Sequence, residues 1–393
     1  MYDLLLLALL LAAVAIGWWL GRRERQATDD QPGQHTLSRD YFVGLNYLLN
    51  EQPDRAIETF VAALEVNSDT IETHIALGNL FRSRGEADRA VKVHQNLLAR
   101  PTLTPAQGSL VQIELARDFL NLGLLDRAEK LLENLIHESS DDSQRQQAKL
   151  LLVDLLEREK EWQAALDVSQ PGLIRQYDNI KRAAAHWLCE LAERDLDSAS
   201  PSLARKKLRQ ALNVDHHCIR ATLLLARMEH DTGHYKAELK LLKRIPGQDP
   251  GSAALILEPL RDAYRLLNDE EGLEKALKEM NEKVPMTATV IMLAESVQRR
   301  AGHLEAAELL QEEMTRTPSL RGLDYLIHLY QQNASSEEQR VLAPLNEHTR
   351  ALLDARPRFR CGQCGFSGTE LHWQCPSCRQ WGTTRPVMGR KSD

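Results

Sequence analysis

A small residue returns at a nearly constant interval along the first half of the chain. Ala56, Ala90, Ala128, Ala165 and Ala204 are separated by 34, 38, 37 and 39 residues. An interval of this size holds two short helices and their turns, and such a unit buries its apolar face only by stacking on its neighbours. The sequence therefore predicts a stacked helical array in place of one globular core.

The residues around each alanine match the tetratricopeptide pattern. Gly44 and Tyr47 precede Ala56 and Phe60 in the first unit. Later units repeat the glycine, aromatic and alanine positions at Gly78, Phe81, Gly85, Phe119, Gly123, Trp162, Gly233, Tyr235, Gly302 and Ala307. Small residues let the two helices of a unit approach closely, and the large aromatic residues fill the layer between them. We expect an all-α tetratricopeptide-repeat superhelix of eight or nine units over residues 37–355, with several lengthened turns.

The first helix of each such unit lines a concave groove. Taking the register above, the polar groove candidates are Asn79, Arg82, Arg117, Asp154, Glu157, Arg220 and Arg227. Each of them is also explained as part of a solvated helix face. Repeat arrays of this kind bind other proteins, and the fold by itself implies no chemistry.

An uncharged apolar stretch lies at the N-terminus. Residues 4–20 read LLLLALLLAAVAIGWWL and are followed by Arg22, Arg23 and Arg25. A helix of this length spans about 26 Å, at the short end of what crosses a bilayer. The arginines behind it favour the cytoplasmic side. We expect a transmembrane anchor at 1–21, a linker at 22–36 and a body facing the cytoplasm. A cleaved signal peptide is the alternative, but such peptides need a basic n-region.

Four of the six cysteines lie close together near the C-terminus. Cys361, Cys364, Cys375 and Cys378 form a C-x2-C-x10-C-x2-C pattern. Two Cys-x-x-Cys turns bring four thiolates to one ion in a closed tetrahedral site, and cytosolic thiols stay reduced. The pattern predicts a domain at 356–393 that holds one metal ion, iron or zinc, in a structural role. Aromatic residues that can supply its apolar cover are Phe359, Phe366, Trp373 and Trp381.

Charge is distributed unevenly along the chain. The whole chain carries a net charge of −7, whereas residues 356–393 hold seven basic and two acidic side chains. A small basic domain therefore follows a large acidic body, and the two can attract each other. The acidic body argues against nucleic acid as a partner.

The remaining cysteines lie near histidines. Cys189 follows His186, and Cys218 follows His216 and His217. A second metal site would need these residues to meet across adjacent repeats; buried cysteines and surface histidines explain them more simply. The chain has no phosphate-binding Gly-Lys-Ser loop, no His-Glu-x-x-His and no Gly-x-Ser-x-Gly, so nothing in it argues for catalysis.

The order of these parts resembles the lipopolysaccharide assembly protein B family of Gram-negative bacteria. The resemblance covers essentially the whole chain, including the start Met1-Tyr-Asp-Leu-Leu-Leu-Leu and the segment Cys361-Gly-Gln-Cys-Gly-Phe. Cys361, Cys364, Cys375 and Cys378 match the metal ligands of the family's rubredoxin-like domain one for one.

The resemblance implies an adaptor and not an enzyme. Members of the family work at the cell inner membrane with the membrane protease FtsH and promote degradation of the lipid A deacetylase LpxC, which limits lipopolysaccharide synthesis. The family is also linked to lipopolysaccharide assembly and to inner-membrane assembly or sensing proteins. The runner-up is a membrane-tethered scaffold for envelope assembly without proteolytic output. A third class of function is electron transfer through an iron centre. The sequence leaves open whether the protein forms homo-oligomers.

Overall fold

The computed structural model describes residues 71–101, 103–332 and 334–387, together with the isolated positions 43, 46, 47, 55 and 59. The chain divides into two compact units, Met1–Leu124 and Leu125–Asp393. The anchor expected at 1–21, the linker expected at 22–36 and most of the first expected repeat lie outside the described residues.

Among the helices of the described segments, none is both long enough and apolar enough to cross a membrane.

The first unit contains α4 (Ile71–Ser83), α5 (Ala87–Leu98) and α6 (Pro105–Leu122). The start of helix α6 is stabilised by its sequence, because Thr104 and Gln107 form a reciprocal capping box and Pro105 occupies the first turn. Helices α4 and α5 pack on each other, and both contact α6. Phe81 is buried between them, as expected of an aromatic residue in that layer.

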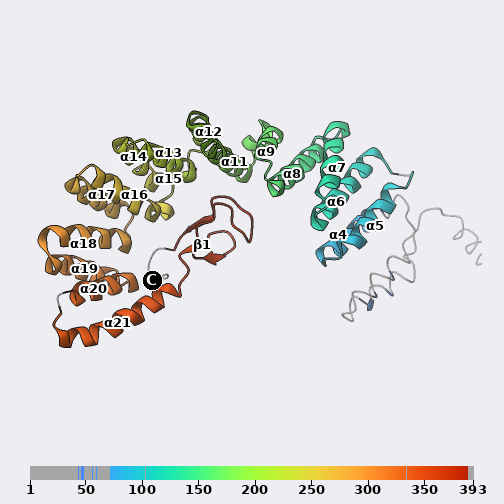
Figure 1. Cartoon of the computed structure of the whole chain (residues 1–393). Coiled ribbons are helices and arrows are strands. Elements are labelled where there is room, and N and C mark those ends of the chain that lie inside the picture. Colours follow the sequence, from blue (N-terminus) through green and yellow to red (C-terminus); the bar gives the residue numbers. More distant parts are fainter. Residues whose placement is uncertain are drawn as a thin grey trace, which may run out of the picture. The chain divides into compact units, whose positions relative to one another are not determined.

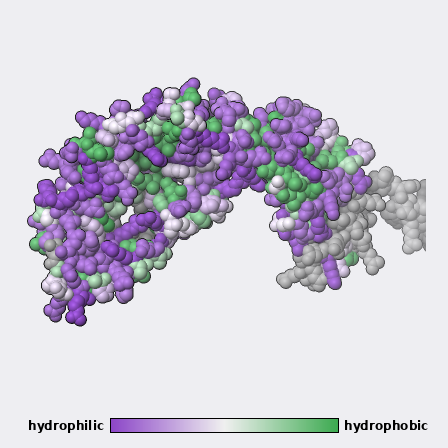
Figure 2. Space-filling model, viewed as in Figure 1, coloured by the Kyte–Doolittle hydropathy of each residue, from purple (hydrophilic) through white to green (hydrophobic). Residues whose placement is uncertain are grey.

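The second unit contains most of the helices and all the strands of the described chain. Its helices are α7 (Leu125–Glu138), α8 (Asp142–Glu159), α9 (Trp162–Ser169), α10 (Gly172–Gln176), α11 (Asp178–Asp197), α12 (Pro201–Val214), α13 (Ile219–Asp231), α14 (Tyr235–Leu242), α15 (Ile245–Gln248), η1 (Pro250–Ile256), α16 (Leu257–Leu266), α17 (Glu270–Lys283), α18 (Thr287–Ala301), α19 (His303–Arg316), α20 (Leu320–Gln331) and α21 (Ser336–Asp354). Figure 1 shows them following one another as packed pairs. The face seen in Figure 2 is mainly hydrophilic, since the apolar faces are turned into the array.

The repeating alanines are buried as the interval predicts. Ala90, Ala128, Ala165 and Ala204 each have no exposed surface. Gly78 shows why one position tolerates no side chain: a Cβ there would collide with the imidazole of His94 on α5. Close helix approach therefore sets the residue size at these positions.

Two insertions account for the long turns. The short helix α10 lies between α9 and α11, inside the 39-residue interval from Ala165 to Ala204. Helix α15 and the 3-10 helix η1 lie between α14 and α16. The short helix α10 thus explains the 39-residue interval, whereas in the 38- and 37-residue intervals the extra length lies in α6 and α8, which have 18 residues each.

The first helices of neighbouring pairs contact one another in the second unit: α11 contacts α13, α16 contacts α18, and α18 contacts α20. A short three-stranded sheet follows α21, with β1 (Phe359–Cys361) between β2 (Ser367–Gly368) and β3 (Thr384–Pro386). Both pairings are antiparallel, with Arg360 opposite Ser367 and opposite Arg385. We call residues 359–386 the ribbon. Figure 1 shows it, labelled β1, inside the curve formed by the helices of the second unit.

Candidate metal centre and the surface that holds it

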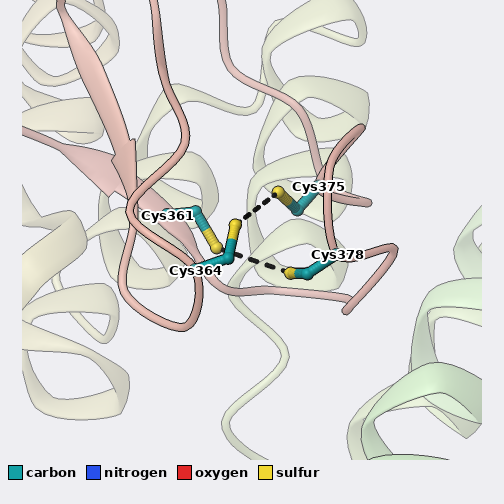
Figure 3. Close-up of side chains that lie close together, drawn as sticks. All are labelled: Cys361, Cys364, Cys375 and Cys378. Carbon is teal, nitrogen blue, oxygen red and sulfur yellow. Dashed lines mark hydrogen bonds between the residues drawn. The ribbon is translucent and has the colours of Figure 1, made fainter. Parts of the chain in front are cut away.

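The ribbon brings its four cysteines together. Their sulfur atoms all lie within 4.8 Å of one another. Among the described residues, no other group of His, Cys, Asp or Glu side chains comes together as a possible metal site. Cys361 Sγ lies 3.8 Å from Cys378 Sγ, and Cys364 Sγ lies 3.7 Å from Cys375 Sγ (Figure 3). Four sulfurs each about 2.3 Å from a central zinc ion would be about 3.8 Å apart. The donor set therefore fits one tetrahedral metal ion.

Each cysteine pair sits in a tight turn that the local sequence provides. The Gly365 N–H donates to the Cys361 carbonyl at 3.0 Å, and the Arg379 N–H donates to the Cys375 carbonyl at 2.8 Å. The Gln363 N–H also points at Cys361 Sγ, 3.4 Å away. Burial acts to raise the pKa of Cys361, but the Thr383 hydroxyl and backbone N–H groups outweigh it and lower that pKa to about 6. These contacts favour the thiolate, which is the form that binds metal.

A bound ion would hold the two turns of the ribbon together. Four sulfur ligands leave no open coordination position, so an ion there supplies folding free energy and not a reaction site. A segment this short has too little core to fold without such a cross-link.

Trp381 anchors the ribbon to the repeats. Its ring stacks on His186 of α11 at 5.2 Å and meets Trp162 of α9 edge-on at 5.8 Å. Its indole Nε1–H donates to Glu157 Oε1 of α8 at 2.5 Å, and Trp187 donates to the same oxygen at 2.7 Å. Trp381, predicted to cover the metal, is therefore buried against the repeats.

The buried groups under Trp381 have shifted pKa values. Burial raises the pKa of Glu157, while the two indole donors and Arg379 oppose that shift. Burial, with Arg220 and Arg182 nearby, lowers the pKa of His186 to about 3, so its imidazole is neutral at physiological pH. A neutral ring packs well against an indole. Gly382 permits this approach, since a Cβ there would lie 2.9 Å from His186 Nε2.

Ion pairs extend the docking surface on both sides of Trp381. Arg379 Nη1 lies 3.2 Å from Asp154 Oδ1, and Arg385 Nε lies 3.1 Å from Asp249 Oδ2. Arg220 lies over the Trp373 ring at 5.9 Å, within cation–π range. The attraction expected between a basic C-terminal domain and an acidic body is thus present as specific contacts.

Arg220 is itself held by the array. Its guanidinium pairs with Glu190 at 2.7 Å and Glu193 at 2.6 Å. Burial acts to lower the pKa of Arg220, but Glu190 and its neighbours outweigh it and raise that pKa above the ordinary value. The side chain is therefore a fixed cation beneath the ribbon.

The groove candidates of the first unit form a polar network. Arg82 pairs with Glu114 at 2.5 Å and with Asp118 at 2.7 Å, and it donates to Asn79 at 2.6 Å. Arg117 Nε lies 3.4 Å from Glu114 Oε1. Among the seven candidates, Asp154, Glu157 and Arg220 hold the ribbon, Asn79, Arg82 and Arg117 join this network, and Arg227 is exposed on α13. Their role in binding a client stays a prediction.

Sequence reasoning missed His186 and Trp162 as parts of the docking surface. His186 was expected on a helix surface, yet it is 2% exposed and lies under Trp381. Cys189 and Cys218 are buried as free thiols with their sulfurs 3.9 Å apart. No histidine joins them in a ligand group among the described residues. The simpler interpretation of the cysteines holds, and the interpretation of His186 was wrong.

Comparisons with known proteins agree with both parts of the fold. Tetratricopeptide-repeat models match residues 73–106 and 113–169, and a rubredoxin metal binding domain model matches residues 359–386. The chain is thus a tetratricopeptide-repeat protein with a C-terminal four-cysteine ribbon, which is a non-enzymatic, protein-binding class.

Relatives over the full length narrow this class. Lipopolysaccharide assembly protein B of Escherichia coli strain K12 is 33% identical over 98% of this chain and 98% of its own. The Haemophilus influenzae protein of the same name is 33% identical over 100% of both chains. The chain belongs to the lipopolysaccharide assembly protein B family. A repeat protein of known structure from Parabacteroides merdae is 13% identical over 72% of this chain and 100% of its own, with a TM-score of 0.35.

Proposed function

We propose that this protein is an inner-membrane adaptor that takes part in lipopolysaccharide assembly and limits lipopolysaccharide synthesis. In this proposal it presents the deacetylase LpxC to the membrane protease FtsH. The observation that carries the proposal is the full-length similarity to proteins named for lipopolysaccharide assembly. The repeat array supports it, because stacked helices offer an extended surface for another protein.

The proposed organisation follows from the sequence. Residues 1–21 anchor the protein, 22–36 link the anchor to the body, 37–355 form the repeat array and 356–393 form the metal domain. A span beside the protease would hold a weakly bound client at a raised local concentration. Tethering of this kind strengthens apparent binding by about 10²–10⁴ without new contacts.

The proposed metal ligands are Cys361, Cys364, Cys375 and Cys378, with iron or zinc as the ion. Their role is to keep the ribbon folded on the inner side of the array, where it contacts α8, α9 and α11. If the ribbon is required for adaptor function, replacing Cys361 and Cys364 by serine abolishes LpxC turnover without removing the protein from the membrane. Normal turnover in that variant would contradict the requirement.

A pulse-chase of LpxC tests the function directly. The half-life is measured with and without this protein while the amount of FtsH is held constant. The adaptor proposal expects LpxC to become long-lived when this protein is absent. An unchanged half-life would refute the proteolytic output and favour the alternative, a membrane-tethered scaffold for envelope assembly. The name of the relatives supports that alternative equally, since it refers to assembly alone.

A further inference from the structure

A cavity of about 380 Å³ opens between α13, α14 and α16, apart from the ribbon. Its apolar lining comes from Leu223 and Ala226 of α13, Leu242 of α14 and Pro259 of α16. Ala226 and Leu242 are buried parts of the core, so this lining is a fixed floor. Helices α13 and α16 are first helices of consecutive pairs, the type that lines the groove of a repeat array.

Carboxylates surround this apolar floor. Glu238 of α14 and Glu258 and Asp262 of α16 line the cavity, together with the guanidinium of Arg227 and the imidazole of His230. Glu258 has no ion-pair partner in the part of the chain that the structure describes, and Asp262 pairs only with its neighbour Arg261, at 3.1 Å. With Glu238 ionised, the three carboxylates exceed the guanidinium groups of Arg227 and Arg261, so the cavity is negatively charged.

Glu238 is a buried carboxyl in the wall of the cavity. The residue is 2% exposed, and its Oε2 lies 2.9 Å from His230 Nδ1. Burial raises the pKa of Glu238, with the His230 contact opposing that shift. When Glu238 is protonated, Glu258 remains without an ion-pair partner among the described residues, and the protonated carboxyl still offers an acceptor oxygen.

We propose that this cavity binds the arginine or lysine side chain of a partner polypeptide that lies along the first helices. A long cationic side chain has an apolar stem and a charged head, and it binds best where both are matched. Here the stem packs on Leu223, Leu242 and Pro259 while the head reaches Glu258 and Asp262. The proposal concerns the chemistry that the surface recognises, and it holds whichever client the adaptor serves.

Two peptides that differ only in charge test the proposal. The probes are acetyl-Leu-Arg-Leu-amide and its citrulline counterpart, which keeps the shape of arginine and removes the charge. The readout is the NMR shift of the Leu223 and Leu242 methyl groups in the full chain. We expect the arginine peptide to give saturable shifts, and the citrulline peptide to bind about fivefold more weakly, the value of a partly exposed ion pair.

A matched pair of variants distinguishes binding in the cavity from nonspecific attraction to a negatively charged surface. Glu258→Gln with Asp262→Asn removes the two rim carboxylates, and Glu279→Gln with Glu282→Gln removes two exposed charges from α17. We expect the first variant to bind both peptides equally weakly and the second to behave as the wild type. Equal affinity for the two peptides in the wild type, no binding of either, or preference for a glutamate peptide would overturn the proposal.

The chain's own C-terminus is a competing occupant. Residues 388–393 lie outside the described residues and include Arg390 and Lys391. Replacing both with glutamine in the full chain should leave peptide affinity unchanged. If instead the wild type binds no peptide and this variant does, the cavity takes the chain's own tail, and the proposed partner is refuted. These experiments use no client turnover, so their outcome is independent of the LpxC half-life.

Discussion

Replacing Trp381 by alanine should release the ribbon from the repeats while leaving its metal ligands in place. Trp381 is 6% exposed and contacts Trp162, His186 and Glu157, which lie on three different helices. The cysteines are not touched by the change. The expected product is a folded, metal-loaded ribbon that spends part of its time undocked.

The size of the effect follows from what Trp381 buries. Removing a buried tryptophan side chain costs about 3–5 kcal/mol. That figure includes the stacking on His186 and the indole hydrogen bond to Glu157, because these losses are not additive. If the substitution removes about 4 kcal/mol of docking free energy, the undocked population rises about a thousandfold. Trp381→Phe keeps most of the ring and loses the hydrogen bond, so its cost is smaller, about 1–3 kcal/mol.

The indole proton of Trp187 reports on this equilibrium. Trp187 is fully buried and donates to Glu157, directly beneath Trp381. Its hydrogen exchange therefore depends on how often the ribbon opens. We expect protection to fall about a thousandfold in Trp381→Ala, less in Trp381→Phe, and not at all in Tyr330→Ala, which removes an exposed ring from α20. A fall of less than about tenfold, some 1.4 kcal/mol, with metal content unchanged, would show that Trp381 does not anchor the ribbon.

Three further changes have defined outcomes. Gly78→Ala should destabilise the first unit by about 1–3 kcal/mol because the new methyl collides with His94. Gly108 has open space around it, so Gly108→Ala should not lower the melting temperature. Equal melting temperatures in both variants would contradict the packing argument. The pKa of Glu157 is raised above its ordinary 4.5 in the folded protein, so the folded state binds the extra proton and the free energy of unfolding falls as pH rises through that raised pKa. The free energy of unfolding of the wild type, relative to that of Glu157→Gln, should therefore increase on acidification from neutral pH, and a pH-independent difference would oppose this assignment. Removing the metal with a chelator should unfold the ribbon and shift the fluorescence of its two tryptophans to the red, and unchanged emission in demetallated protein would show that the ribbon folds without an ion.

Local spacing carried most of the correct predictions. The buried alanines and the four convergent cysteines each depend on residues a few positions apart or one repeat apart. In such cases helix geometry or a tight turn fixes which side chains meet. The same patterns identify the class of fold because every unit repeats the constraint.

Docking of the ribbon could not be read from the sequence in the same way. Arg379 and Asp154 are 225 residues apart, and no periodicity links them. Only the opposite charges of the C-terminal domain and the body pointed to this contact, without naming residues. The burial of His186 could not be predicted either, because a polar helix face is expected to be exposed unless the element that covers it is known. From the sequence, Trp381 is only an aromatic residue that could cover the metal site. Its burial against the repeats is known only from the structure.

Docking also divides the inner surface of the second unit by accessibility. Asp154, Glu157 and Arg220 lie under the ribbon, so a client that needs them must first displace Trp381, at about 4 kcal/mol or nearly a thousandfold in affinity. Arg227 and the cavity beside it need no such displacement. Substitutions at Asp154 or Glu157 should therefore act first on ribbon docking, whereas substitutions at Glu258 or Asp262 should leave docking unchanged and, on the proposal above, weaken client binding. A client whose affinity falls with Glu258→Gln while Trp187 stays protected binds at the cavity, and one that exposes Trp187 on binding competes with the ribbon.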